Sequence, residues 1–365
     1  VGGEPRLDGK PVAAIHADLT GSAPGHAATD LTQAQPLPAN KGRSFFGVCL
    51  AGPFKVDTAT ALKWLRESGN PNGRPNSDVV RPIYNGSDIT RRWAGNWVVD
   101  FAALDLAEAA DYLAPFAYVE AAVKPIRIGN REAVRAEKWW RHGRLRPELR
   151  TALAGLTHYI ATPETAKHRF FVKFPVAVAP EHSLIVIPRQ DDATLGILSS
   201  RIHCVWALAK GGTLEDRPRY NASLTFETFP FPPGFELQAK TAPEGKAFAS
   251  IAAAATDLAA WREKWLNPEG WLDWEITPEE EQAGFPPRPV PKPEHAAAWK
   301  KRTLTNLYNE KPAGLMLRQT QLDQAVAAAY GWTDYSPELP DSEILLRLLD
   351  LNRERAKREK SSEKA

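Results

Sequence analysis

The sequence contains very little sulfur, with two cysteines and one methionine among 365 residues. Cys49 and Cys204 lie far apart, and no Cys or His stands at metal-ligand spacing from either, which argues against a disulfide framework and a zinc site. No apolar run approaches the length of a membrane span, and no signal peptide is visible. We therefore expect a soluble cytoplasmic protein that has neither a membrane partner nor a metal.

Complete catalytic motifs are also missing. No Gly-rich loop of the dinucleotide, P-loop or S-adenosylmethionine type follows a predicted strand, and there is no GxSxG elbow and no HExxH helix. The eight histidines are scattered along the chain, and an isolated histidine is usually a core or surface residue. The sequence thus predicts no catalytic residue and no cofactor bound by this chain.

Positive charge is concentrated locally, although the net charge is only +2. The segment 124–150 contains nine basic residues and three acidic ones. On a helix, five of these cations would share one face and could neutralise phosphates along a DNA strand: Lys124, Arg127, Arg131, Arg135 and Lys138. The alternative is a solvated helix face with Trp139 and Trp140 in the core, which is what a run of charges usually represents.

Polar side chains suited to base edges lie on two predicted loops that flank strands. Arg can bind guanine and Asn can bind adenine through paired hydrogen bonds in the major groove. The candidates around the Asn85-Gly86 turn and in the TPETAKHR loop are Arg81, Asn85, Arg91, Arg92, Lys167 and Arg169. The alternative is a pair of surface turns whose arginines only increase solubility.

The hydrophobic pattern predicts an α+β fold, in which short strands and helices are mixed and a mainly helical region follows. We expect a mixed domain over 41–235 and a helical region over 236–365, with a Pro-rich linker at 276–295. The strands expected are Val12–Ala17, Phe45–Val48, Trp97–Phe101, His158–Ala161, Phe170–Phe174 and Leu184–Pro188. The helices expected are Thr58–Ser68, Leu195–Lys210, Lys246–Trp265, Ala296–Asn309, Leu317–Tyr330 and Ser342–Arg358.

Several stretches resemble one family. They include SFFGVCLAGPF, RPNSDVVRPIYNGSDITRR, YIATPETAKHRFF, SRIHCVWALAKGG and RYNASLTFETFPFP, followed by RTLTNLYNEKPAGL and LDQAVAAAYGW. In order and over nearly the whole chain, they resemble the C-terminal half of MmeI-like (type IIL/IIG) adenine-specific DNA methyltransferases. The resemblance implies a target recognition domain that docks in the major groove of double-stranded DNA, followed by a helical segment.

The same resemblance implies that catalysis resides elsewhere. Family members bind S-adenosylmethionine and the flipped adenine with a methyltransferase domain that carries a cofactor loop and an NPPY-type tetrapeptide. This sequence has neither, so no catalytic residue can be assigned, and residues 1–40 are expected to be the tail of that domain. The expected partner is therefore a methyltransferase domain. It could lie in cis, as part of a restriction-modification enzyme, or act in trans, with this chain as a specificity subunit. A protein-interaction module without a DNA role is the third hypothesis.

Overall fold

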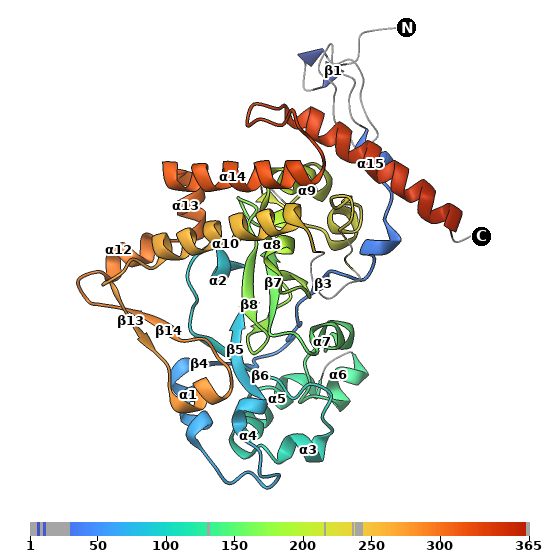
Figure 1. Ribbon diagram of the computed structural model, residues 1–365. Coiled ribbons are helices and arrows are strands. Elements are labelled where there is room, and N and C mark those ends of the chain that lie inside the picture. The colour runs from blue at the N-terminus through green and yellow to red at the C-terminus, as the bar shows by residue number, and fades with distance from the viewer. Residues whose placement is uncertain are drawn as a thin grey trace. The chain divides into compact units, whose positions relative to one another are not determined.

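The computed structural model describes residues 6–7, 10–11, 30–129, 132–214, 217–235, 237 and 244–362. It has the predicted α+β fold, in which small, mainly antiparallel sheets alternate with helices (Figure 1). The chain divides into two compact units, each built from segments that are separate in the sequence. The sheet unit comprises Phe45–Gln190 and Asp257–Leu315, and the helical unit comprises Val1–Ser44, Asp191–Thr256 and Met316–Ala365.

The first sheet of the sheet unit is antiparallel, with the strand order β3-β10-β7-β8. All four residues of β10 are buried, as are five of the six in β7, because these inner strands are covered on both faces. The sequence predicted each of these strands to within two or three residues. Their bounds are β3 Phe45–Phe46, β7 His158–Pro163, β8 Val172–Pro175 and β10 Leu184–Ile187.

The second sheet has the strand order β4-β6-β5-β9, in which β9 pairs with β5 in parallel and the other pairs are antiparallel. Trp97, Val98 and Val99 of β6 are fully buried, and Ala61, Trp64 and Leu65 of helix α1 pack in the same hydrophobic cluster. The pattern around Arg81 predicted a loop, but β5 is a strand. The bounds are β4 Lys55–Asp57, β5 Val80–Tyr84, β6 Asn96–Val99 and β9 Ala179–Pro180.

Short helices and one hairpin complete the sheet unit. The Pro-rich segment 276–295 contains helix α11 and strand β14, which pairs antiparallel with β13. The helix expected over Ala296–Asn309 is interrupted at Arg302-Thr303, where the Thr303 hydroxyl caps α13. The bounds are α1 Thr58–Arg66, η3 Asn76–Asp78, α2 Gly86–Thr90, α3 Leu106–Ala110, α4 Leu113–Ala122, α5 Lys124–Arg127, α6 Ala133–Glu137, α7 Pro147–Leu153, β13 Leu272–Glu275, α11 Pro278–Gln282, β14 Arg288–Pro291, α12 Ala296–Lys301 and α13 Leu304–Glu310.

The helical unit contains a close approach between α8 and α10 that requires glycine. A Cβ atom on Gly196 would lie 2.6 Å from Cγ2 of Ile251. The helix expected over Leu195–Lys210 is two helices, because the Ser200 side chain caps the start of α9. The bounds are β1 Arg6–Leu7, β2 Lys10–Pro11, η1 Leu31–Gln33, η2 Pro38–Asn40, α8 Asp192–Ser199, α9 Arg201–Gly211, β11 Thr213–Leu214, β12 Arg217–Pro218, η4 (a π-helix) Ala222–Phe226 and α15 Asp341–Ser362, while α10 Lys246–Leu266 and α14 Ala313–Ala329 contribute residues to both units.

Buried asparagines fix segment 30–44 within the helical unit. The Asn40 amide group donates to the carbonyl of Phe229 over 2.7 Å, and the Asn352 side chain bonds both the N–H and the carbonyl of Gln35. Because Asn352 also donates to the buried carbonyl of Thr228, its loss would remove the hydrogen bonds to one buried and two partly buried backbone groups. The predicted strand Val12–Ala17 and most of residues 1–40 lie outside the described residues.

No helix in the described ranges combines the length and the apolar character needed to cross a membrane.

Asp323 provides a test of the helical unit. Its carboxylate accepts hydrogen bonds from the backbone N–H of Arg201 (2.7 Å) and from the Gln319 side chain (2.9 Å), but burial raises the pKa of Asp323 to about 7. Since the unfolded pKa is about 3.9, the neutral carboxyl stabilises the fold below about pH 4, and this contribution is lost as the pH rises through 7.

We expect the free energy of unfolding to fall by about 2–3 kcal/mol between pH 5 and pH 8 relative to the variant Asp323→Asn, which keeps an acceptor but cannot ionise. Urea denaturation of both proteins at the two pH values measures this difference. The same pH dependence in both proteins would contradict the proposed burial of the charge.

Candidate nucleic-acid interface

The corner between β5 and α2 is built by a capping box. The side-chain oxygen of Asn85 accepts hydrogen bonds from the N–H groups of Ser87 (2.7 Å) and Asp88, while the Asp88 carboxylate accepts from the Asn85 N–H. The Gly86 N–H donates to the Ser183 hydroxyl, which joins the corner to the first sheet. Asn85 therefore uses its carbonyl oxygen to begin the helix, and its side chain is only partly exposed.

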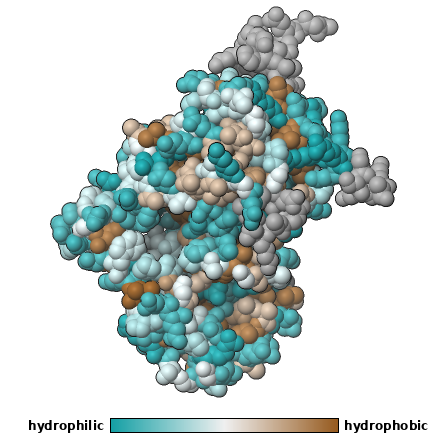
Figure 2. Space-filling view, in the orientation of Figure 1, coloured by the Kyte–Doolittle hydropathy of each residue, from teal (hydrophilic) through white to brown (hydrophobic). Residues whose placement is uncertain are grey.

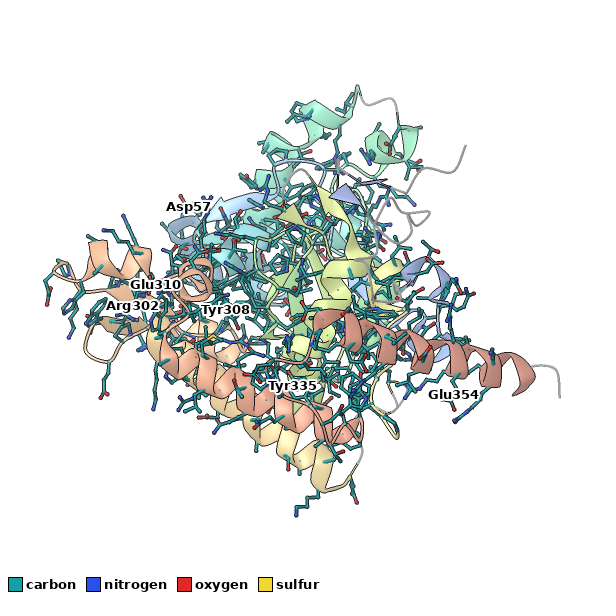
Figure 3. The ribbon with its side chains drawn as sticks, turned by 90° about the horizontal axis from the view of Figure 1, so that it is seen from above. Asp57, Arg302, Tyr308, Glu310, Tyr335 and Glu354 are labelled. Carbon is teal, nitrogen blue, oxygen red and sulfur yellow. The ribbon has the colours of Figure 1, made fainter. Side chains whose placement is uncertain are left out.

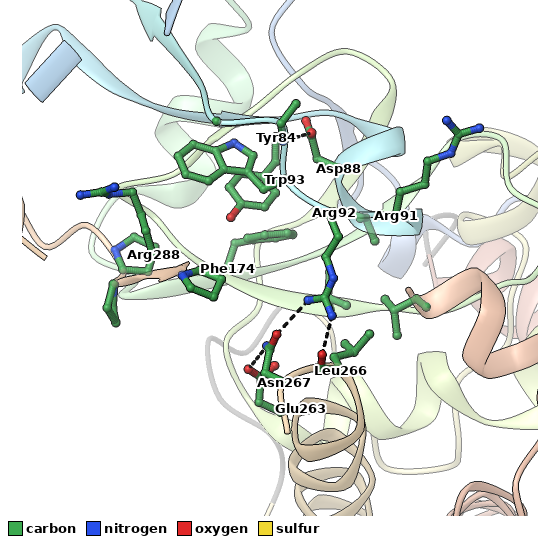
Figure 4. A pocket seen from close by; sticks show the side chains of 18 of the residues that line it. Tyr84, Asp88, Arg91, Arg92, Trp93, Phe174, Glu263, Leu266, Asn267 and Arg288 are labelled. Carbon is green, nitrogen blue, oxygen red and sulfur yellow. Dashed lines mark hydrogen bonds between the residues drawn. The ribbon is translucent and has the colours of Figure 1, made fainter. Parts of the chain in front are cut away.

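The two arginines that follow α2 have different surroundings. Arg91 is exposed, whereas the Arg92 guanidinium donates to the Leu266 carbonyl and to the Asn267 side chain (2.8 Å) and lies 4.2 Å from the Trp299 ring centroid. Burial lowers the pKa of Arg92 to about 10. Figure 4 shows Arg92 directed at Leu266 and Asn267, and Arg91 pointing away from them. Of this pair, Arg91 is accessible to a ligand.

A cavity of about 600 Å³ lies beside these arginines (Figure 4). Tyr84 and Trp93 in its wall are stacked, with ring centroids 5.3 Å apart, and Phe174 packs on Tyr84 at 4.9 Å. Arg288 at its edge is bound to Glu280 over 2.9 Å. The rings thus cover one another and the Arg288 charge is paired, so this wall serves mainly to pack the structure.

The connection between β7 and β8 is shaped by a buried arginine. The Arg169 guanidinium donates to the Thr162 hydroxyl (2.9 Å) and to the Pro163 carbonyl, and the Thr162 hydroxyl donates to the Phe170 carbonyl. Arg169 is only 8% exposed, whereas Lys167 two residues earlier is exposed. Arg169 therefore folds the loop, while Lys167 and the half-buried His168 reach its surface.

Helix α13 joins the β7–β8 loop to the end of α2. The Thr305 hydroxyl donates to the Thr90 carbonyl over 3.0 Å. One turn further along the same face, the Asn309 side chain bonds Lys167 and His168. We call the surface formed by Arg91, Lys167, His168 and Asn309 the recognition face. It unites one residue from each loop proposed from the sequence.

His168 and Asn309 were not among the sequence candidates. His168 is one of eight scattered histidines, and Asn309 is separated from the loop by about 140 residues. No spacing signal links them, because a tertiary contact alone brings them together.

Arg81 has a partly buried position in β5, beside a cavity of about 280 Å³ that Asp100 and Arg150 also line. Arg150 donates to both oxygens of Asp100 at 2.8 and 2.9 Å. Burial alone would raise the pKa of Asp100, but the neighbouring His142, Arg150 and Arg81 outweigh it and hold the pKa well below its usual range. Arg81 thus helps to stabilise a buried carboxylate.

The basic segment 124–150 does not form the single helix on which its shared basic face depended. Helix α5 ends at Arg127, and α6 begins only at Ala133, after the Gly129-Asn130 pair. Lys124 is paired with Glu120 at 2.7 Å, and Arg135 with Glu132 at 2.8 Å. Lys138 is exposed, and Arg131 lies outside the described residues.

Arg127 is the most deeply buried of these cations, with 2% of its surface exposed. Its guanidinium donates to four backbone carbonyls: those of Leu50 and Ala51 at 2.9 Å, Trp139 at 3.2 Å and Arg141. Trp139 and Trp140 are buried as well, as the structural alternative for this segment required. Arg127 therefore holds irregular backbone segments together.

The face drawn in Figure 2 is largely hydrophilic, and its hydrophobic side chains form small separate patches. Within the described part of the chain, no group of three or more His, Cys, Asp or Glu side chains could hold a metal ion.

Part of the chain matches a known family model. The model of the MmeI target recognition domain matches residues 159–233, which contain the β7–β8 loop. The resemblance to MmeI-like proteins is confirmed. The solved structure of the Type IIL restriction-modification enzyme MmeI in complex with DNA has a TM-score of 0.66 to this chain at 18% identity, and the match covers 95% of this chain and 39% of that one.

A curated relative is DNA methyltransferase A of Bacillus subtilis (strain 168), which is 27% identical over 189 residues. The match covers 50% of this chain but only 16% of that protein, so the chain spans a small part of the relative's length.

Arg127 gives a test of its structural role. Changing Arg127→Met should lower the free energy of unfolding by at least about 3 kcal/mol, because four carbonyls lose a charged donor. Lys138→Met removes an exposed charge from the same segment and should change stability by no more than about 0.5 kcal/mol. Urea denaturation compares the two. A stable Arg127→Met protein with weakened DNA binding would instead assign Arg127 to phosphate contact.

Proposed function

We propose that this chain supplies DNA sequence recognition for a site-specific adenine methyltransferase of a restriction-modification system. The observation that carries the proposal is the recognition face, whose exposed or half-buried side chains come from three segments. Helix α13 links these segments, through Thr305 to the residue before Arg91 and through Asn309 to Lys167 and His168. Base edges are read by such donors, presented on a rigid scaffold. The match of 159–233 to the MmeI target recognition domain supports it, and we assign the recognition domain to 41–235.

The catalytic chemistry is assigned to a methyltransferase domain, in cis or in trans. The sequence of this chain has no Gly-rich cofactor loop and no NPPY-type tetrapeptide, so no residue here fits S-adenosylmethionine. When bound to such a domain, the cofactor supplies the methyl group. The role of this chain is to choose the site, and we propose that it acts in the cytoplasm.

Among the sequence candidates, the contacts favour Arg91 and Lys167 as base readers. Arg92 and Arg169 are held by intramolecular hydrogen bonds, Asn85 caps α2, and Arg81 faces Asp100. We propose that these four position the readers. We propose that, without a shared helix face, phosphate contacts are made individually by the cations of segment 124–150 other than the buried Arg127: Lys124, Arg131, Arg135 and Lys138.

The base-reading role is tested by binding the 365-residue chain to a randomised pool of DNA duplexes and sequencing the bound fraction. The wild type should enrich one motif. Arg91→Ala and Lys167→Ala should each cost roughly 1–3 kcal/mol on that motif and relax the preference at one position. Lys63→Ala, which removes an exposed charge on α1, serves as the control and should leave the preference intact.

Equal weakening on all sequences would reassign the residue to the DNA backbone. Failure of the wild type to bind any duplex at low salt would favour the protein-interaction alternative.

Phosphate contacts predict salt dependence. The logarithm of the binding constant should fall with the logarithm of the salt concentration, with a slope of about −0.9 per contact. Replacing both Arg135 and Lys138 with Ala should flatten that slope by up to about 2 and weaken all sequences alike. DNA-binding titrations between 50 and 200 mM salt measure the slope. An unchanged slope in the double variant would show that Arg135 and Lys138 do not contact phosphates.

A further inference from the structure

The Asn309 side chain is shared between the two residues of the β7–β8 loop that reach the surface. Its Oδ1 atom lies 2.7 Å from Nζ of Lys167 and 2.8 Å from Nε2 of His168. Asn309 and Lys167 are both exposed, so this small cluster faces solvent.

The chemistry of lysine fixes the orientation of the whole cluster. An ammonium group has only donors, so the Asn309 atom that faces it must be the carbonyl oxygen. The same oxygen contacts Nε2 of His168, which must therefore carry a hydrogen. In the neutral imidazole, Nδ1 is then left as an acceptor.

Asn309 is held in place by the helix that carries it. Leu304 and Leu307 of α13 are buried, and the ring centroid of Tyr308 lies 5.5 Å from that of Phe170 and 6.0 Å from that of His168. The Arg262 guanidinium covers the Tyr308 ring at 5.6 Å. Figure 3 shows Tyr308 and Glu310 close together on α13. A side chain on a packed helix can hold two loop residues in a defined geometry.

The cluster presents an ordered set of hydrogen-bonding groups. The Lys167 ammonium keeps further N–H donors, the Asn309 amide contributes two more, and Nδ1 of His168 accepts. The Asn309 side-chain oxygen already accepts hydrogen bonds from Lys167 and His168. Asn309 therefore cannot use both its oxygen and its amide group to bind adenine, as an asparagine without such partners can. In the major groove, a G·C pair shows two acceptors, N7 and O6 of guanine, beside one donor, N4 of cytosine. An A·T pair instead places its donor between its two acceptors. Because Asn309 contacts both Lys167 and His168, the donors of Lys167 and Asn309 are neighbours and the His168 acceptor stands at one end, which is the order complementary to G·C.

We propose that Asn309 is a specificity-determining residue, which positions Lys167 and His168 to recognise one G·C base pair. This inference rests on the proposed function. It also makes α13, which lies outside the stretch matched to the target recognition domain, part of the DNA-reading surface.

The test compares two substitutions of similar size in the 365-residue chain. Asn309→Leu removes the acceptor, so the preference for G·C at one position of the enriched motif should fall by about tenfold. Asn309→Asp keeps an acceptor for both partners, so it should retain that preference while its negative charge weakens binding to all duplexes alike. Glu310→Gln, on the same helix, is the control and should keep the preference.

Coupling provides a second readout. Lys167→Met should lose the preference at the same position as Asn309→Leu, and the double variant should be no worse than the more severe single one, because the two residues act as a unit. Since Asn309 is exposed, the melting temperature should stay close to that of the wild type in all these variants.

The outcomes separate the two proposals. If the wild type enriches no motif, the proposed function fails. If it enriches a motif whose preferences survive Asn309→Leu, the function stands and the role of Asn309 is overturned. Loss of preference at an A·T pair overturns the assignment to G·C.

Discussion

Backbone carbonyls in irregular segments need hydrogen-bond donors, and in this protein buried arginines supply many of them. Arg127 joins four carbonyls, Arg169 closes the β7–β8 loop, and Arg262 donates to the Phe171 carbonyl. A guanidinium has five N–H donors in a fixed planar arrangement, so one side chain can hydrogen-bond to several separate backbone segments. Within the recognition face, the β7–β8 loop that carries Lys167 and His168 depends on Arg169 for its shape, because the loop contains little regular structure of its own.

This use of arginine explains where sequence reasoning succeeded and where it could not. The strands around Tyr159 and Ile185 were predictable, because β-branched and aromatic runs bounded by turn residues are typical of buried strands. The sequence cannot distinguish an arginine that donates hydrogen bonds to backbone carbonyls from one that binds a DNA phosphate. The adjacent Trp139 and Trp140 were the available sign that segment 124–150 packs against a core.

The candidate site was predictable only in part. The loop after β7 and the turn after β5 were identified from their polar residues, and Arg91 and Lys167 do reach the surface. Which of their neighbours would be buried depends on sheet order and on the register of β7 with β10, and neither is encoded locally. Asn309 joins the site through a contact that spans about 140 residues, beyond the range of any periodicity.

The cluster of Lys167, His168 and Asn309 is divided between a loop and a helix that is distant in the sequence. This division limits which segments of the protein can be exchanged with those of a relative. Grafting residues 159–233 into a relative would transfer Lys167 and His168 without α13. The two side chains would then contact the residue that the relative has at the position of Asn309. Under the role proposed for Asn309, an exchange of specificity must carry the loop and its helix together, which makes the smallest interchangeable part discontinuous in the sequence.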